Sequence, residues 1–246
     1  MFIHVHLWFH NTVNARIILV RPRNPVNIGA VARVMANFGF RDLAVVSPYP
    51  PSWEEAHRAG PGAEEVISAA KVTTTLAEAL TGCRFVVGTT SGARRRMDRP
   101  LQALPGFRTK GNTALVFGSE KHGLDKEDLS HCHVLLRIPT ATATPSMNLA
   151  AAVAVCCYEI VRKKERGKKE RGTRNEERVA EACQVLRLLD QTAGVLDKAG
   201  FLDSQRRASH LRKLRQIALR SGLRPQDVAL LTAALSALEY QLATGH

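Results

Sequence analysis

The sequence has 246 residues, of which 45% are hydrophobic, so it can build one medium domain and a smaller one, and this composition argues against global disorder. Lysine and arginine number 35 against 22 aspartate and glutamate residues, and the net charge of +13 favours an anionic partner, most simply nucleic acid, although it can also serve solubility alone. No apolar run has the length of a membrane span, and the N-terminus lacks the basic segment and cleavage site of a signal peptide, so we expect a soluble protein without a membrane.

The cysteines and histidines indicate neither a disulfide scaffold nor a metal site. The five cysteines are odd in number and include no C-x-x-C pair, a pattern that fits a reducing cytoplasm. Cys156 and Cys157 lie in an apolar run and are expected to be small buried side chains. Three histidines between residues 4 and 10 alternate as strand residues do, and the run 131–133 is too tight for a tetrahedral zinc site, so no metal is expected.

Between Arg16 and about Arg162, short apolar runs alternate with helical periodicity. Strands are expected at 16–20, 43–48, 84–90, 113–120 and 133–140. Helices are expected at 27–40, where Gly39 would cap the C-terminus, within 54–82, where Thr75 would be an N-cap, and after Ser146. Continuous apolar strands that alternate with helices predict an α/β domain with a mostly parallel sheet.

The chain then becomes strongly charged. From Arg162 to Arg178 it carries nine basic and four acidic residues with no apolar side chain, which predicts a basic linker that can extend the preceding helix. Three amphipathic helices are expected at 179–201, 204–222 and 224–243, separated by Gly200, Gly222 and Pro225. The middle helix has a dense basic face, which can bind nucleic acid or simply face solvent.

Four polar loops follow predicted strands, at 21–33, 88–96, 117–124 and 138–148. Ligands of open α/β sheets bind outside the carboxyl ends of the strands, so the four loops can converge on one crevice. Gly and Ser also favour ordinary turns, which is the simpler explanation for any one of them. The loop at 118–123 has glycines at Walker spacing, but Leu124 and Asp125 follow where Lys and Ser or Thr are needed, which excludes a P-loop.

The segment 144–159 places Ser146 and Asn148 at the start of an almost wholly apolar helix. Both residue types are good N-caps, because their side chains accept hydrogen bonds from backbone N–H groups that lack an intrahelical partner. One cap would be enough, so we expect this pair to have a second role.

Three segments together resemble a known family. The segments 24–39, 114–140 and 145–159 resemble, in order and spacing, the three motifs of the SPOUT-class RNA 2′-O-ribose methyltransferases of the TrmH/SpoU superfamily, most of all its TrmJ branch. The resemblance implies an α/β SPOUT fold with a parallel sheet and a C-terminal deep trefoil knot, plus a small all-α C-terminal domain. It also implies a homodimer through the knot region, S-adenosylmethionine as the methyl donor, and the ribose at position 32 of the tRNA anticodon loop as the acceptor.

With this resemblance, the chain divides into an N-terminal extension (1–15), a methyltransferase domain (16–162), a basic linker (163–178) and a helical RNA-binding domain (179–246). The residues that match the family's donor site are Thr89, Thr90, Ser91, Gly118, Ile138, Pro145, Ser146 and Met147. The residues that match the polar groups around the reacting ribose are Asn27, Arg33, Glu120, Ser146 and Asn148. The basic residues expected to bind RNA are Arg23, Arg94, Arg95, Arg96, Arg206, Arg207, Arg212, Lys213 and Arg215.

The sequence departs from the family pattern at Pro145, which removes a backbone donor, and at Met147, which replaces a usual Leu with little change in volume. Family accounts often make the residue at Arg33 the general base. Because arginine is always protonated in proteins, we expect Arg33 to contact a phosphate and stabilise the developing alkoxide while the proton goes to phosphate or water. The alternative role is an ion pair on the helix surface. Glu120 is expected to anchor the loops rather than to act as the base.

Two other functions remain open from the sequence. The same chemistry on ribosomal RNA is one, because the motifs belong to the catalytic domain and do not choose the RNA. A non-catalytic RNA-binding module is the other, and the presence of Asn27, Arg33, Glu120 and Asn148 argues against it.

Overall fold

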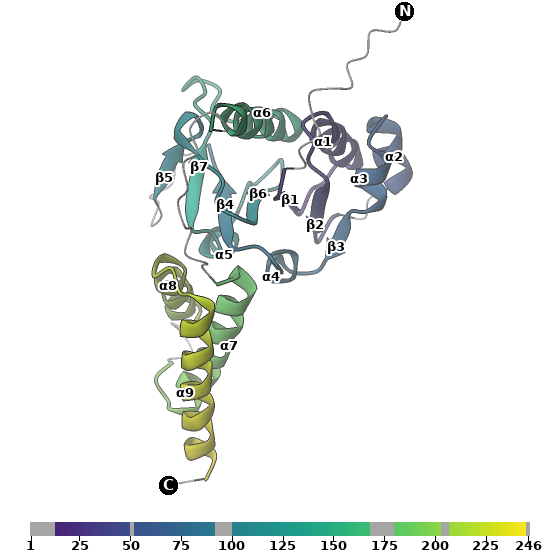
Figure 1. Cartoon of the computed structure of the whole chain (residues 1–246). Helices are drawn as coiled ribbons and strands as arrows, with labels where there is room; N and C mark the ends of the chain where they lie inside the picture. Colours follow the sequence, from purple (N-terminus) through teal and green to yellow (C-terminus); the bar gives the residue numbers. More distant parts are fainter. Residues whose placement is uncertain (1–12, 50–51, 92–99, 168–179, 203–206, 245–246) are drawn as a thin grey trace, which may run out of the picture.

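The computed structural model describes residues 13–49, 52–91, 100–167, 180–202 and 207–244. A seven-stranded sheet in the order β3-β2-β1-β6-β4-β7-β5 forms its centre, and all neighbouring strands are parallel (Figure 1). The strands are β1 (Ala15–Val20), β2 (Asp42–Val46), β3 (Lys71–Thr73), β4 (Phe85–Thr89), β5 (Leu101–Ala103), β6 (Thr113–Phe117) and β7 (Val134–Arg137). The predicted parallel α/β sheet is confirmed.

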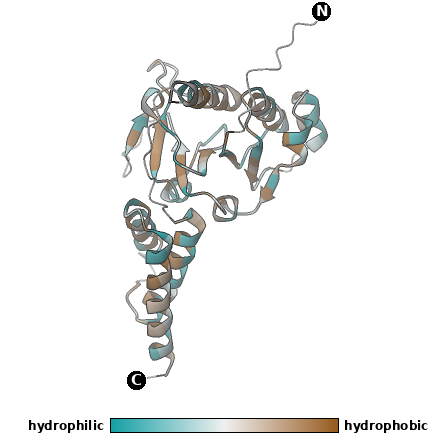
Figure 2. Ribbon diagram, viewed as in Figure 1, coloured by the Kyte–Doolittle hydropathy of each residue, from teal (hydrophilic) through white to brown (hydrophobic). Residues whose placement is uncertain are grey.

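Helices cover both faces of the sheet. Ile17 and Leu19 of β1 pack on the side of α1 and α6, whereas Ile18 and Val20 pack on the side of α4 and the first turn of α7. This alternation follows from the two-residue period of a strand. The helices are α1 (Pro25–Asn37), α2 (Trp53–Ala59), α3 (Glu64–Ser68), α4 (Leu76–Ala79), α5 (Lys126–Ser130), α6 (Leu149–Gly167), α7 (Ala182–Lys198), α8 (Arg207–Arg220) and α9 (Pro225–Thr244). Figure 2 shows the apolar strands enclosed between these layers.

Local signals account for where several helices begin and end. Asn24 caps α1 by accepting a hydrogen bond from the N–H of Val26 at 2.9 Å. Gly39 follows the C-terminal cap of α1 with a φ of 74°, and Thr75 caps α4 as predicted, accepting from the N–H of Glu78 at 3.2 Å. Cys156 and Cys157 are fully buried, as expected.

Three elements were not predicted from the sequence. The edge strands β3 and β5 have three residues each, and every residue of β5 is exposed, so neither shows an apolar run. The helical segments expected within 54–82 are present as α2, α3 and α4, and between them Lys71–Thr73 forms an additional strand by edge pairing with β2. The five-residue helix α5 is too short to display helical periodicity.

The three helices expected after the charged segment are present as α7, α8 and α9, and Pro225 is the first residue of α9. They extend from the face of the sheet that carries α4 and α5 (Figure 1). Helix α6 continues five residues into the predicted linker, to Gly167, and the rest of that linker up to 179 lies outside the described residues. None of the helices in the described ranges is both long enough and apolar enough to cross a membrane.

One ion pair joins α8 to α5. The Nη1 atom of Arg215 donates to Oε1 of Glu127 at 2.6 Å and to the hydroxyl of Ser130. Nε2 of His131 lies 3.8 Å from the same Glu127 oxygen. The hydrogen bond from His131, opposed by burial and helped by the one from Arg215, lowers the pKa of Glu127 to about 2. Arg215, which we expected to bind RNA, is therefore mostly buried in a contact that ties the helical part to the sheet domain.

We expect Arg215→Ala to lower the free energy of unfolding by about 1 kcal/mol at pH 7, a value reduced for the exposure of the Glu127 side chain. Because the folded pKa of Glu127 lies below its ordinary 4.5, the stabilisation is present above pH 4.5 and is lost as the pH falls towards 2. Urea unfolding at pH 7 and pH 3 measures the difference, which should shrink at pH 3. Lys213→Ala, on an exposed position of the same helix, is the control, and an equal loss from both variants would contradict the prediction.

Candidate functional site

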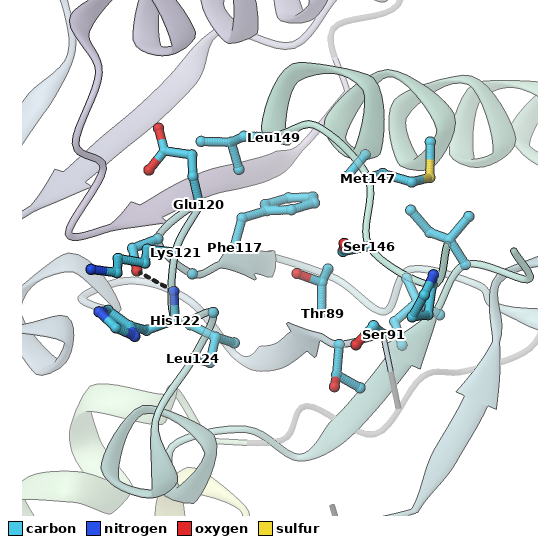
Figure 3. A pocket seen from close by; sticks show the side chains of 18 of the residues that line it. Thr89, Ser91, Phe117, Glu120, Lys121, His122, Leu124, Ser146, Met147 and Leu149 are labelled. Carbon is cyan, nitrogen blue, oxygen red and sulfur yellow. Dashed lines mark hydrogen bonds between the residues drawn. The ribbon is translucent and has the colours of Figure 1, made fainter. Parts of the chain in front are cut away.

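A pocket of about 430 Å³ lies where β4, β6 and β7 end and α6 begins (Figure 3). Its volume suits a small-molecule ligand. Carboxyl ends of parallel strands meet at one edge of the sheet, which explains why segments far apart in the sequence gather here. The lining residues are Thr89, Thr90, Ser91, Phe117, Gly118, Ser119, Glu120, Lys121, His122, Gly123, Leu124, Leu129, Leu136, Ile138, Thr140, Pro145, Ser146, Met147, Leu149 and Ala152.

The pocket brings together all eight residues that the resemblance assigned to a donor site. They come from three of the four strand-end loops, which therefore do converge. The fourth loop, at 21–33, reaches the pocket through a hydrogen bond to Glu120. The role of these residues in binding a donor stays a prediction, and their common position supports it.

The loop after β6 is folded tightly against itself. A Cβ atom on Gly118 would lie 2.1 Å from the carbonyl carbon of Gly123 and 2.2 Å from the nitrogen of Leu124, so only glycine fits there. Ser119 and Gly123 form a β-bridge, the hydroxyl of Ser119 accepts from the N–H of His122 at 3.3 Å, and Gly123 has a φ of 66°. The loop thus presents its backbone and the buried Leu124 to the pocket.

At the start of α6, the two residues predicted as caps, Ser146 and Asn148, have different roles. The side-chain oxygen of Asn148 accepts from the N–H groups of Ala150 at 2.9 Å and Ala151 at 3.4 Å, so Asn148 is the cap. Ser146 lines the pocket instead, and its hydroxyl points inward in Figure 3. Asn148 itself does not line the pocket, and only its amide nitrogen is left to meet a substrate.

Glu120 stands at the rim of the pocket and holds the first helix. Its Oε1 accepts from the side chain of Asn27 at 2.7 Å, and its Oε2 accepts from the backbone N–H of Arg23 at 3.1 Å. Burial raises the pKa of Glu120, but the hydrogen bonds from Asn27 and from the backbone outweigh this and hold the pKa below its ordinary value. Glu120 is therefore an ionised anchor at neutral pH and a weak base.

The remaining predicted residues lie apart from the pocket. Arg33 is exposed on α1, and its guanidinium makes no hydrogen bond or ion pair within the described part of the chain. The bidentate pair of Arg207 with Asp197 and the buried contact of Arg215 engage two of the basic residues of α8. Arg94, Arg95, Arg96 and Arg206 fall outside the described residues.

Sequence reasoning missed several lining residues. Phe117, Leu124, Leu129, Leu136 and Leu149 give the pocket an apolar wall, but in the sequence they look like ordinary core residues. Lys121 and His122 could have been predicted, because they lie in the strand-end loop that follows β6. The described residues contain no group of three or more His, Cys, Asp or Glu side chains able to hold a metal ion.

Comparisons with known proteins bear on this site. The model of the SpoU rRNA Methylase family matches residues 14–158. The chain is 41% identical over 161 residues to a tRNA (cytidine-2′-O-)-methyltransferase TrmJ of Methanocaldococcus jannaschii, which covers 62% of this chain and 69% of the relative. It is 33% identical over 238 residues to a tRNA (cytidine/uridine-2′-O-)-methyltransferase TrmJ of Shigella dysenteriae serotype 1, and this alignment covers 93% of this chain and 96% of the relative.

A solved structure gives the same likeness in three dimensions. The crystal structure of TrmJ from Z. mobilis ZM4 matches with a TM-score of 0.79 and 29% identity, over 92% of this chain and 99% of that one. This match extends over the helical part as well as the sheet domain.

Proposed function

The chain belongs to the SpoU methylase family and is a methyltransferase, and on that premise we propose that it methylates a ribose 2′-hydroxyl of tRNA with S-adenosylmethionine as the donor. The observation that carries the proposal is the single pocket that gathers all eight residues of the predicted donor site. The TrmJ names of relatives that align over most of the chain support tRNA as the substrate. We further propose position 32 of the anticodon loop and a cytoplasmic location.

The pocket fits the proposed donor. Its apolar wall of Leu124, Leu136 and Leu149 suits an adenine ring, and Thr89, Ser91 and Ser146 offer hydroxyl groups. The backbones of Gly118 and Gly123 are in close contact beside the pocket. Any side chain at Gly118 would displace the loop after β6. When bound, S-adenosylmethionine supplies an activated methyl group on a positively charged sulfur.

The residues around the pocket would align the acceptor. Glu120 fixes α1 against the loop after β6 through Asn27, so the ribose would meet a rigid rim. Arg33, which is always protonated, would contact the phosphate beside the ribose and stabilise the developing alkoxide. The proton would leave to phosphate or water.

Since Arg33 does not line the pocket of its own chain, we propose that a second copy supplies it. Helices α1 and α6 lie side by side, and Tyr158 of α6 is 55% exposed while its ring packs edge-on against Phe38 at 6.2 Å. An exposed aromatic side chain on this helix pair supports a homodimer interface here. The deep trefoil knot and the domain boundaries stay predictions, which the match to a solved TrmJ structure supports.

The test is transfer of a tritiated methyl group to total tRNA and to ribosomal RNA, followed by mapping of the labelled nucleotide. We expect label in tRNA, at the ribose of nucleotide 32. Label in ribosomal RNA alone would overturn the choice of substrate, and no label in either would overturn the enzymatic proposal as a whole.

Glu120→Gln separates an anchor from a base. Glutamine can accept from Asn27 or from the Arg23 N–H but brings a new donor into the rim, so we expect single-turnover methyl transfer to fall by about 10-fold. Because Glu120 is already ionised at neutral pH, the pH profile between 6 and 9 should keep its shape. Loss of a titration step near neutrality in the variant would instead identify Glu120 as the base.

A further inference from the structure

A second recess adjoins the proposed donor pocket. It has a volume of about 550 Å³, lies between the loops that follow β1 and β2, and shares Ser119, His122 and Gly123 with the first pocket. Its other lining residues are Arg21, Arg23, Ser47, Pro48, Tyr49 and Asp125. The two cavities therefore meet at the loop after β6, so a ligand in one lies next to a ligand in the other.

The two loops that form this recess contain unusual backbone conformations. Arg21 has a φ of 51° and Ser47 a φ of 41°, and they are the non-glycine residues with positive φ among those described. Each directly follows a strand and precedes a proline, at Pro22 and Pro48, a position that is already restricted. Such conformations are unfavourable for a side-chain-bearing residue and tend to occur at functional sites.

Hydrogen bonds hold both strained residues in place. The N–H of Arg21 donates to the carbonyl of Val46 at 2.8 Å, and the Arg21 guanidinium pairs with Asp125 at 3.0 Å and with Asp128. The N–H of Ser47 donates to Thr73 at 2.9 Å. The backbone at both strand ends is thus fixed, which sets the direction of the residues that follow.

Two residues after each strained position come Arg23 and Tyr49, and the Arg23 guanidinium lies over the Tyr49 ring. The guanidinium carbon of Arg23 lies 5.6 Å from the centre of the Tyr49 ring, and Tyr49 is 66% exposed. Their backbones are tied as well, since the N–H of Tyr49 donates to Pro22 at 3.1 Å and the N–H of Arg23 to Glu120. Within the described residues no carboxylate pairs with the Arg23 guanidinium, whereas Arg21 has two such partners.

We propose that this recess binds the base of an unpaired RNA nucleotide next to the methylated one, stacked on the exposed Tyr49 ring with Arg23 alongside. An aromatic ring and a guanidinium plane stack on any base, and the unpaired charge of Arg23 attracts the adjoining phosphate. Position supports the same assignment, because Glu120 binds both Arg23 and Asn27 and so fixes the recess relative to the donor pocket. The inference rests on the proposed function, to which it adds a subsite for a neighbouring nucleotide.

The test compares Tyr49→Ala with Tyr49→Phe in the full-length protein. With a tRNA transcript as substrate, we expect Tyr49→Ala to raise KM and the directly measured Kd for the tRNA by about 10-fold, the scale of losing one base stack, with kcat nearly unchanged. Tyr49→Phe keeps the ring and should behave as the wild type. Affinity for S-adenosylmethionine, measured by calorimetry, should be the same in all three proteins.

A second substrate decides whether the lost contact is to a base. Two transcripts are needed, one with an abasic residue 5′ of the target nucleotide and one with an abasic residue 3′ of it. One of the two should bind the wild type about 10-fold more weakly than the intact transcript does, and Tyr49→Ala should not weaken the binding of that transcript further. Equal Kd and KM for the wild type and Tyr49→Ala would overturn the subsite. So would a loss of affinity on Tyr49→Ala substitution that is as large with both abasic transcripts as with the intact one. If the wild type methylates no RNA, the proposed function fails, while the Kd comparison still decides the subsite.

Discussion

Replacement of Arg33 by alanine should lower the rate of methyl transfer to tRNA by about 10²- to 10³-fold, the cost of removing one fixed donor that meets charge developing in the transition state. Affinity for S-adenosylmethionine should not change, because the proposed partner of Arg33 is the phosphate beside the ribose and not the methyl donor. Single-turnover kinetics and calorimetry measure the two effects separately. A fall in the rate of methyl transfer of less than about 3-fold would show that Arg33 has no role in catalysis and is only a surface residue of α1.

The same variant tests whether two copies build each site. We expect Arg33→Ala and Gly118→Ala to be inactive as homodimers for different reasons. A heterodimer of the two, purified through two tags, would hold one site with an intact pocket and an Arg33 from its partner, and should recover about half of the wild-type rate. No recovery would show that Arg33 acts within its own chain.

Gly118→Ala should have the second large effect, the loss of donor binding. The new methyl group would overlap the backbone at Gly123 and Leu124, at 2.1 and 2.2 Å, and backbone cannot rotate aside as a side chain does. The loop that carries Ser119 and Glu120 must therefore shift. We expect the Kd for S-adenosylmethionine to rise by at least about 100-fold and the free energy of unfolding to fall by about 2 kcal/mol.

A glycine outside the site provides the matched control. A Cβ atom on Gly29 would lie 2.0 Å from the carbonyl oxygen of Ala56, where α1 packs on α2. Gly29→Ala should cost a similar free energy of unfolding of about 2 kcal/mol and leave the Kd for S-adenosylmethionine close to that of the wild type. If both variants lose donor affinity equally, the effect of Gly118 is general instability of the fold.

The elements with a regular hydrophobic pattern and the loops at strand ends could be predicted from the sequence. The buried strands β1, β2, β4, β6 and β7 are continuous apolar runs, and their ends supplied the loops of the pocket. Short edge strands and α5 were missed because three to five residues show no period. The place of Arg215 could not be predicted, since a basic residue on a basic helix gives no sign that its partner is a carboxylate on α5.

The different roles of Ser146 and Asn148 at the start of α6 could not be predicted from the sequence either. Ser146 and Asn148 are equally good caps by residue type, and only the structure shows that Asn148 accepts from Ala150 while Ser146 turns to the pocket. The strained pair Arg21 and Ser47 was not predicted either, because a positive φ at a residue before proline contradicts local preference.

The strand order has a consequence for how the chain is made. The interior strand β1 pairs with β6, starting at Ala15 and Thr113, so its partner leaves the ribosome about 100 residues later, a delay of roughly 5 to 20 s. During that time β1, β2 and β3 can pair, but the inner edge of β1 stays open beside apolar residues such as Ile17 and Leu19. An open edge of this kind is a template for wrong pairing, and the nascent chain is therefore most vulnerable to aggregation until β6 has been synthesised.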